Sequence, residues 1–218
     1  MIAEQCGLSF SGGKDSILAL DRVMRAGQRV DYLVTMYDAA SERVRFHGVP
    51  ITHIQAQADA LHIPLLRYPT TPENFEAVFL QALQDLRQRH VTSIIFGNIH
   101  LADVRAWYEE RTTQAGLQHL EPLWNEAPAK LVRECIARGY LATLTCIEVA
   151  RARAEWLGAT LTAQLVEEFE QTEIDPCGER GEYHTFVSAG PLFSRPLAIR
   201  LGETKTMPGF QLVDILLP

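Results

Sequence analysis

The sequence predicts an α/β fold, with a mostly parallel sheet followed by a smaller α+β unit. Short apolar runs alternate with helical patterns up to residue 123, and this alternation is typical of a parallel sheet. The hexapeptide Ser11–Ser16 (Ser-Gly-Gly-Lys-Asp-Ser) joins the first apolar run to the first helical pattern. After Trp124 the pattern changes to strand-like runs with fewer helices.

In the first half, strands are expected to alternate with amphipathic helices. The expected strands are Cys6–Phe10, Tyr32–Tyr37, Leu65–Tyr68, Ser93–Gly97 and His119–Leu123. The expected helices are Asp15–Ala26, Ile51–Leu61, Pro72–Arg89 and 101–115. Helical spacing of the apolar residues supports these helices. Parallel sheets of this kind bind ligands at the carboxyl ends of their strands, so residues that directly follow a strand are candidates for a site.

The second half is expected to contain two helices and several strands. One helix should begin near Pro128 and end at Gly139, because proline suits the first helical position and glycine the C-terminal cap. Tyr140–Ile147 is an expected strand, and the second helix carries Leu161, Leu165, Val166 and Phe169. From Tyr183 onward the chain contains short strand-like runs. The change of pattern places a domain boundary near residue 125, which gives domains 1–125 and 126–218.

Composition excludes several classes of protein. Of 218 residues, 47% are apolar and 22% are charged, which excludes a mainly disordered chain. No run approaches the roughly 18 apolar residues of a membrane span. Residues 1–7 lack the basic and apolar pattern of a secretory signal, so a cytoplasmic location is expected.

The net charge and the spacing of the cysteines disfavour some partners and some kinds of site. The net charge is −7, from 20 basic and 27 acidic residues, which disfavours a large nucleic-acid partner because phosphate contacts need a basic face. The four cysteines are far apart, which disfavours a zinc site built from cysteine pairs and, in a cytosolic setting, disulfides. The C-terminal run 210–217 is compatible with an internal strand or with part of a homodimer interface.

The hexapeptide Ser11–Ser16 has the chemistry of a pyrophosphate-binding loop. Its two glycines let the backbone approach a bulky anion and adopt conformations that other residues avoid. The helix that follows points its unpaired N–H groups and positive dipole end at that anion. Ser11 and Ser16 supply hydroxyl donors, and Lys14 supplies a positive charge.

The loop differs from the Walker P-loop. Leu8 stands where that motif needs its first glycine, and Asp15 stands where it needs Ser or Thr after the lysine. A Gly-Gly turn capped by Asp15 or Ser16 would also explain the start of a helix without any ligand. The complete hexapeptide directly after a strand favours the phosphate interpretation.

The hexapeptide resembles the signature of the PP-loop ATP pyrophosphatases, whose nucleotide-binding domain has a HUP-type parallel sheet. The resemblance implies that an oxygen of a carboxylate or carbonyl is adenylated by ATP, that pyrophosphate leaves, and that a nucleophile then displaces AMP. It also implies Mg²⁺ bound with ATP, with Asp15 as a candidate to orient the ion, although helix capping is an equal alternative for Asp15. The implied ATP-binding residues are Ser9, Ser11, Gly12, Gly13, Lys14, Asp15, Ser16, Met36 and Gly97.

A second segment, Gly178–Thr185 (Gly-Glu-Arg-Gly-Glu-Tyr-His-Thr), gathers ionisable residues on a loop that enters a strand. In a strand, Glu182 and His184 would share one face because they are two residues apart. Such a pair suits holding an ammonium ion or moving a proton. The alternative is a surface turn followed by an exposed strand.

With this segment the chain resembles the diphthine–ammonia ligase family of PP-loop enzymes. That family carries a Gly-Glu-x-Gly-Glu-[Phe/Tyr]-His-Thr motif, which 178–185 match. Shorter matches are Phe96–Ile99, Leu120–Trp124 and Gly190–Phe193. The resemblance spans nearly the whole chain, and it implies a nucleotide-binding domain with a smaller C-terminal domain closing over the site.

Two features depart from the common family pattern. The family often has Gly-Asp where this chain has Gly97-Asn98, which bears on how metal or substrate is handled. The stretch Arg45–Val49 resembles a bacterial branch of the family. Bacteria do not make diphthamide, and genomic context suggests cobalamin salvage for that branch. The resemblance therefore leaves open a corrinoid or another small metabolite as the substrate of the same chemistry.

Three further residues are candidates because they lie near the carboxyl ends of expected strands. His47 follows the second strand, and Asp103 and Arg105 follow the fourth. Arg105 suits a phosphate or carboxylate, although a helix-surface ion pair is an equal alternative. Cys177 lies beside the second motif, but no second cysteine is spaced as a partner for sulfur transfer.

Together these features predict an AMP-forming carboxylate–ammonia ligase, with ATP, ammonia and a carboxylate as its partners. The expected catalytic residues are Lys14, Asp15, Glu179, Glu182 and His184. The expected substrate-binding residues are His47, Asn98, Asp103, Arg105, Glu179, Arg180, Glu182, Tyr183, His184 and Thr185. A non-catalytic nucleotide-binding module is the alternative, because fold alone does not fix activity.

Overall fold

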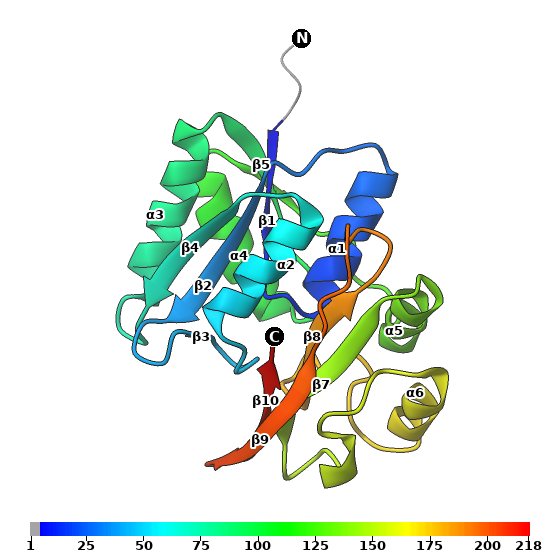
Figure 1. Ribbon diagram of the computed structural model, residues 1–218. Coiled ribbons are helices and arrows are strands. Elements are labelled where there is room, and N and C mark those ends of the chain that lie inside the picture. Colours follow the sequence, from blue (N-terminus) through cyan, green and yellow to red (C-terminus); the bar gives the residue numbers. More distant parts are fainter. Residues whose placement is uncertain (1–4) are drawn as a thin grey trace.

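The computed structural model describes residues 5–218, and each half of the chain contributes one sheet (Figure 1). The strands of the first sheet are β1 (Gln5–Ser9), β2 (Tyr32–Asp38), β3 (Arg43–Val44), β4 (Leu65–Thr70), β5 (Val91–Ile95) and β6 (Gln118–Leu120). Its parallel strands run in the order β4-β2-β1-β5-β6. The short β3 pairs antiparallel with the end of β2. The predicted parallel α/β sheet is therefore confirmed.

Helices cover both faces of this sheet. They are α1 (Lys14–Arg25), α2 (Ile51–Leu61), α3 (Phe75–Gln88) and α4 (Ala102–Gln114). One apolar cluster contains Ile17 of α1 and Ile54 of α2, and the other contains Leu83 of α3 with Trp107 of α4 packed against it. In this doubly wound order the direction of winding reverses between β1 and β5, and such a reversal opens a crevice at the carboxyl ends of the strands.

The second half forms an antiparallel sheet in the order β8-β7-β10-β9. Its strands are β7 (Leu141–Glu148), β8 (Tyr183–Ala189), β9 (Arg200–Met207) and β10 (Phe210–Leu216), and its helices are α5 (Pro128–Ala137) and α6 (Ala163–Glu170). The C-terminal run is thus an internal strand, because β10 lies between β7 and β9. Leu161 precedes α6, since Thr162 caps this helix by accepting the N–H of Leu165.

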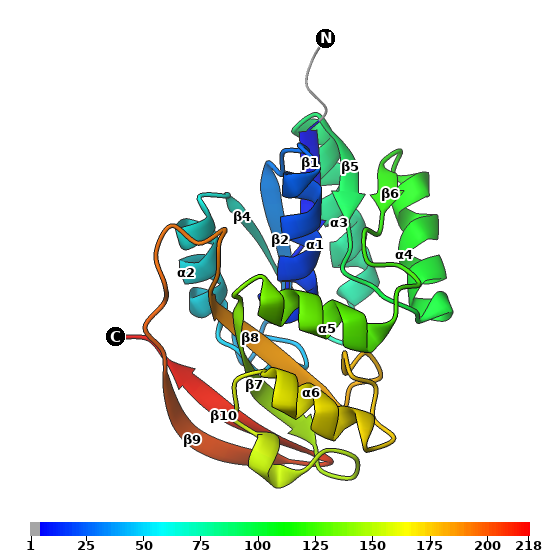
Figure 2. The ribbon, with the colours of Figure 1, turned by 90° about the vertical axis from the view of Figure 1, so that its right-hand side faces the viewer.

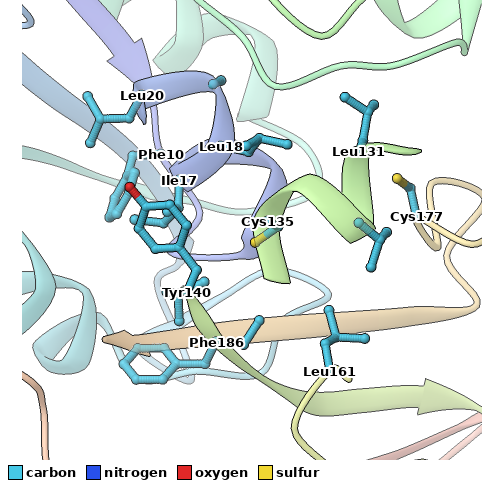
Figure 3. Packing of buried hydrophobic residues seen from close by; sticks show 14 of the residues in the cluster. Phe10, Ile17, Leu18, Leu20, Leu131, Cys135, Tyr140, Leu161, Cys177 and Phe186 are labelled. Atoms are coloured by element: carbon cyan, nitrogen blue, oxygen red, sulfur yellow. The ribbon is translucent and has the colours of Figure 1, made fainter. Parts of the chain in front are cut away.

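The two halves share one apolar core. Figure 3 shows Leu131 and Cys135 of α5 close to Ile17 and Leu18 of α1, and one cluster of buried residues contains all four. In Figure 2, α5 crosses the lower end of α1. The first sheet ends at residue 120 and the second begins at residue 141. The boundary near residue 125 falls between them and stays a prediction.

Buried polar contacts reinforce the joint at α1. The fully buried carboxylate of Asp21 accepts two hydrogen bonds from Arg138, at 2.9 and 3.1 Å, and one from the hydroxyl of Tyr140 at 2.8 Å. The next residue of α1, Arg22, pairs with Glu126 and Glu134. α1 therefore connects the phosphate-loop end of the first half to the second sheet. Within residues 5–218, no helix has the length and apolar character needed to cross a membrane.

Candidate functional site

The loop between β1 and α1 depends on its two glycines. Gly12 has a φ of 77°, and a Cβ placed there would lie 2.2 Å from Oε1 of Gln57. A Cβ on Gly13 would lie 2.7 Å from Cε1 of His47. Neither distance is one that a real Cβ tolerates, so the loop is closely packed by side chains that are distant in sequence.

The second motif packs directly on this loop through β8. The backbone N–H of Lys14 donates to Oγ1 of Thr185 at 3.0 Å, and the N–H of Val187 donates to the carbonyl of Gly12 at 3.0 Å. Nε2 of Gln57 donates to the carbonyls of both Gly12 and Val187, at 2.9 and 2.7 Å. The two sequence motifs therefore form one structural unit, held by buried hydrogen bonds.

A cavity of about 300 Å³ opens where the two motifs meet. It lies beside the winding reversal of the first sheet, because its walls include residues that follow both β1 and β5. A Cβ on Gly97 after β5 would lie 3.0 Å from the backbone of Asp15, so glycine lets the two loops approach each other. The predicted site residues that line this cavity are Ser9, Ser11, Lys14, Asp15, Ser16, His47, Gly97, Asn98, Glu179, Tyr183, His184 and Thr185.

Lys14 is a buried cation held by the second motif. Its Nζ donates to Oδ2 of Asp15 at 2.9 Å and to the carbonyl of Cys177, and it lies 4.7 Å from the centre of the Tyr183 ring. Burial is the largest single effect and lowers the pKa of Lys14, but Asp15, Tyr183 and Cys177 together outweigh it and hold this pKa well above its usual value. Burial also raises the pKa of Asp15, which Lys14 partly offsets.

Two histidines form another wall of the cavity. The rings of His47 and His184 lie 4.7 Å apart, and Nδ1 of His47 is 3.1 Å from the carbonyl of Thr185. Because a carbonyl can only accept, this contact assigns the proton of His47 to Nδ1. Burial lowers the pKa of His47 to about 4 and lowers that of His184 well below its usual value. Both rings are therefore neutral near pH 7.

Glu179 connects the second motif to the loop that follows β5. Its two carboxylate oxygens accept the backbone N–H groups of Ile99 and His100, at 2.8 and 2.9 Å. Burial raises the pKa of Glu179, while these two hydrogen bonds favour its charged form. A carboxylate that lines the cavity and has a raised pKa is suited to accept a proton.

Glu182 and Arg180 lie away from this cavity. The side chain of Glu182 is 1% exposed, and its Oε1 accepts the N–H of Asp175 at 3.1 Å and pairs with Arg151 at 3.1 Å. β8 begins only at Tyr183, so Glu182 belongs to the preceding loop. Arg180 lines a separate cavity with Glu173 and Asp175. The roles expected for these two residues stay predictions.

The residues predicted after β5 are divided between the cavity and the surface. Asn98 lines the cavity and donates to Oε1 of Glu121 at 2.7 Å. Arg105 pairs with the other oxygen of Glu121 at 3.2 Å and lies 4.6 Å above the ring of Trp124. Asp103 is exposed in the first turn of α4. Arg105 therefore pairs with a buried carboxylate outside its own helix, and its expected role in substrate binding stays a prediction.

A second cavity of about 500 Å³ adjoins the first. The two cavities share Ser9, Ser11, His47, Val104 and Tyr108. The second cavity is more apolar, with walls that include Val34, Met36 and Phe75. Met36, one of the implied ATP-binding residues, thus lies in the neighbouring apolar cavity, whereas the glycine loop borders the polar one.

Three residues of this region are not among the site residues predicted from the sequence. Gln57 lies within an ordinary amphipathic helix, yet its side chain is fully buried and joins both motifs. Tyr108 lines both cavities from α4. His100 bonds to Asp175 through Nε2. Only His100 had a local indication, because it follows the Phe96–Ile99 match directly.

Comparison with known sequences matches both halves of the chain to one family. Residues 5–119 match the diphthamide synthase N-terminal domain, and residues 127–214 match the diphthamide synthase C-terminal domain. Proteins named diphthine–ammonia ligase from Danio rerio and Homo sapiens are each 27% identical over 89% of this chain, which covers 86% and 82% of their lengths. The Schizosaccharomyces pombe protein of that name is 25% identical over 87% of this chain, which spans 35% of its length.

Among solved structures, a crystal structure described as a predicted subunit of tRNA methyltransferase from Methanocaldococcus jannaschii is similar to this chain. The two share 15% sequence identity, with a TM-score of 0.49 over 85% of this chain and 97% of the other.

Proposed function

The chain belongs to the diphthamide synthase family, and on that premise we propose that it is an ATP-dependent ligase that joins ammonia to a carboxylate. The observation that carries the proposal is the packing of the phosphate loop against the second motif, with Lys14 bonded to Thr185 and both motifs lining one cavity. A nucleotide bound at the loop would therefore face the ionisable residues of the second motif. The relatives named diphthine–ammonia ligase support the same class of reaction.

In this proposal each of the two adjoining cavities binds one part of ATP. The nucleoside occupies the apolar cavity near Met36 and Phe75, and the phosphates extend along Ser11–Ser16 into the polar cavity. The hydroxyl oxygens of Ser11 and Ser16 lie 3.4 Å apart, and both residues line the polar cavity. Lys14 stabilises the charge that develops on the phosphate oxygens when the α–β bond breaks.

In this proposal Mg²⁺ is coordinated by one carboxylate of the chain, and the other ligands come from ATP and water. Within residues 5–218, no group of three His, Cys, Asp or Glu side chains is arranged to hold a metal ion. Mg²⁺ that accompanies ATP is held mainly by phosphate oxygens and water, with about one or two protein carboxylates. The side chain of Asp15, 34% exposed and lining the cavity, fits this role.

The proposed reaction has two steps. An oxygen of the substrate carboxylate attacks the α-phosphorus, which forms an acyl-adenylate and releases pyrophosphate. Ammonia then attacks the acyl carbon, AMP leaves, and the proton lost from nitrogen passes to a base. Glu179, with its raised pKa, and His184, which is neutral, both line the cavity where this base is needed.

The test follows labelled ATP with Mg²⁺ and ammonium, with and without a desalted metabolite pool. Pool-dependent release of AMP and pyrophosphate would support the ligase, and release of ADP and phosphate would contradict it. Lys14→Ala should abolish the release, whereas Lys130→Ala, at an exposed surface position, should not. Tight ATP binding without cleavage, in the pool or with elongation factor bearing diphthine, would favour a nucleotide-binding module.

A further inference from the structure

A third cavity, of about 480 Å³, lies between the two halves of the chain. The segment that joins β3 to α2 forms one wall and the turn between β9 and β10 forms another, and these segments lie close together below the first sheet in Figure 1. A Cβ on Gly48 would lie 3.4 Å from Leu212 of β10, which shows how closely the two walls approach. We call this cavity the interdomain pocket.

The interdomain pocket is continuous with the proposed nucleotide site. It shares Val44, Arg45 and Phe46 with the apolar nucleoside cavity. The nucleoside cavity in turn shares His47 with the polar cavity at the phosphate loop. A small molecule in the interdomain pocket would therefore reach toward the α-phosphate along residues 45–47.

The floor of the pocket is apolar. Val44 and Leu212 are buried, with 5% and 7% exposure, and Cys146 and Phe210 lie beside them. At the rim, Met207 is 51% exposed. A volume of this size with mainly apolar walls is typical of small-molecule sites.

Arg45 gives the mouth of the pocket a positive charge. Its guanidinium lies over the rings of Phe46 and Phe75, at 5.8 and 5.7 Å, and within residues 5–218 it forms no hydrogen bond or ion pair with another side chain. Two carboxylates interact with the charge of Arg45 without forming an ion pair with it. They are Asp38, which also lines the pocket and accepts hydrogen bonds from Ser41, and Glu73. By contrast, Arg43 is neutralised by Asp214 at 2.7 Å.

The same arrangement disfavours a cationic ligand. Aromatic rings bind quaternary ammonium groups through their faces. Here the guanidinium of Arg45 already occupies a face of both Phe46 and Phe75, and it would repel a second cation.

The backbone conformation of Phe46 is a second observation, independent of charge, that supports ligand binding in this pocket. It has a φ of 66°, in the left-handed region that a bulky residue rarely adopts, and its side chain is 71% exposed. Backbone strain of this kind concentrates at ligand-binding positions. The strain falls on a residue that borders both the interdomain pocket and the nucleoside cavity.

We propose that the interdomain pocket binds the body of the acid substrate, and that it selects a small acid with an apolar body rather than a cationic substrate. The inference rests on the proposed ligase function, because it assigns the substrate class of that reaction. The apolar body contacts Leu212 and Phe210, and Arg45 attracts the carboxylate at the mouth and directs it toward the nucleotide. This step is binding alone, so no bond changes in the pocket.

The test uses probes that share an aromatic body and differ in charge. 8-Anilinonaphthalene-1-sulfonate, an anionic fluorophore, reports occupancy of the pocket in the full-length protein, and 4-phenylbutyrate and phenyltrimethylammonium compete with it. We expect saturable binding of the fluorophore and displacement by 4-phenylbutyrate at concentrations at least tenfold lower than by phenyltrimethylammonium. Equal displacement by both probes, or none by 4-phenylbutyrate, would overturn the inference.

Variants locate the binding. Arg45→Met keeps an apolar side chain of similar length and should weaken binding of 4-phenylbutyrate about tenfold, the size of one charge-assisted contact. Met207→Asp, at the exposed rim, should weaken it as well, whereas Arg200→Met removes an exposed charge from β9 and should leave it unchanged. Affinity in Arg45→Met equal to that of the unaltered protein would contradict the inference.

Release of pyrophosphate from ATP, measured in the same samples, separates this inference from the proposed function. Selective probe binding without any acid-dependent cleavage would support the pocket and count against the ligase. Acid-dependent cleavage that is unaffected by Arg45→Met would support the ligase and count against the pocket.

Discussion

The backbone N–H of Lys14 donates a 3.0 Å hydrogen bond to Oγ1 of Thr185, although 171 residues separate them in sequence. This bond joins the first residue of α1 to β8, so the phosphate loop is built by both halves of the chain. A loop fixed in this way has its shape before a nucleotide arrives. The structure of the loop should therefore depend on residues of the second half.

Thr185→Val tests that dependence. Valine has nearly the shape of threonine but leaves the buried N–H of Lys14 without an acceptor, which should destabilise the protein by about 1–3 kcal/mol. Chemical denaturation measures the change, and ATP affinity measured by calorimetry should fall in the same variant. Thr204→Val, on exposed β9, is the matched control and should change neither quantity. An unaltered free energy of unfolding in Thr185→Val would mean that the bond is dispensable.

Gly12→Ala and Gly27→Ala separate backbone strain from steric conflict. Both glycines have positive φ, at 77° and 86°, so alanine should destabilise either position by about 1–2 kcal/mol through strain. Nothing lies within 4 Å of a Cβ on Gly27, whereas one on Gly12 meets Gln57 at 2.2 Å and Ile54 at 2.7 Å. Gly12→Ala should therefore be more destabilising and should also abolish ATP binding. Equal thermal shifts in the two variants would show that the loop adapts to the methyl group.

Asp21→Ala tests the joint between the halves. The substitution removes the buried acceptor of Arg138 and Tyr140, and loss of a buried partner should destabilise the protein by about 3 kcal/mol. Glu170→Ala breaks the exposed pair with Arg133, which solvent screens, and should change stability far less than Asp21→Ala does. Urea denaturation of both variants gives the comparison. Similar values for the two would show that the buried contacts do not hold the halves together.

The lowered pKa of His47 predicts a pH dependence of stability. Its folded pKa is about 4, below the ordinary value of 6.5, so between these two values the unfolded chain binds more protons than the folded chain. Stability from this group is therefore complete above pH 6.5 and falls as the pH decreases toward 4. His47→Asn should flatten the decrease over this window in unfolding experiments at successive pH values. His90→Asn, at an exposed residue, should keep the full slope, and a His47→Asn curve parallel to the original would refute the assignment.

Much of the first half was predictable because its signals are local. Periodic apolar residues and the Gly-Gly turn predicted a helix at Asp15–Ala26, and α1 spans Lys14–Arg25. The two-residue β3 was missed because it is too short for any period to show. In the second half, β9 carries mostly exposed residues without alternation, so the sequence predicted strand-like runs there but not their limits.

The sequence by itself determined which chemical groups this protein brings to its site, because glycine, lysine and the motif 178–185 are recognisable from their local spacing. Only the tertiary structure decided which of these groups face one cavity. Glu179 and His184 line it, whereas the carboxylate of Glu182, from the same motif, accepts the backbone N–H of Asp175 and pairs with Arg151 instead. The physical reason is that side-chain direction in a loop depends on hydrogen-bond donors supplied by distant segments, and local spacing does not encode where those donors lie.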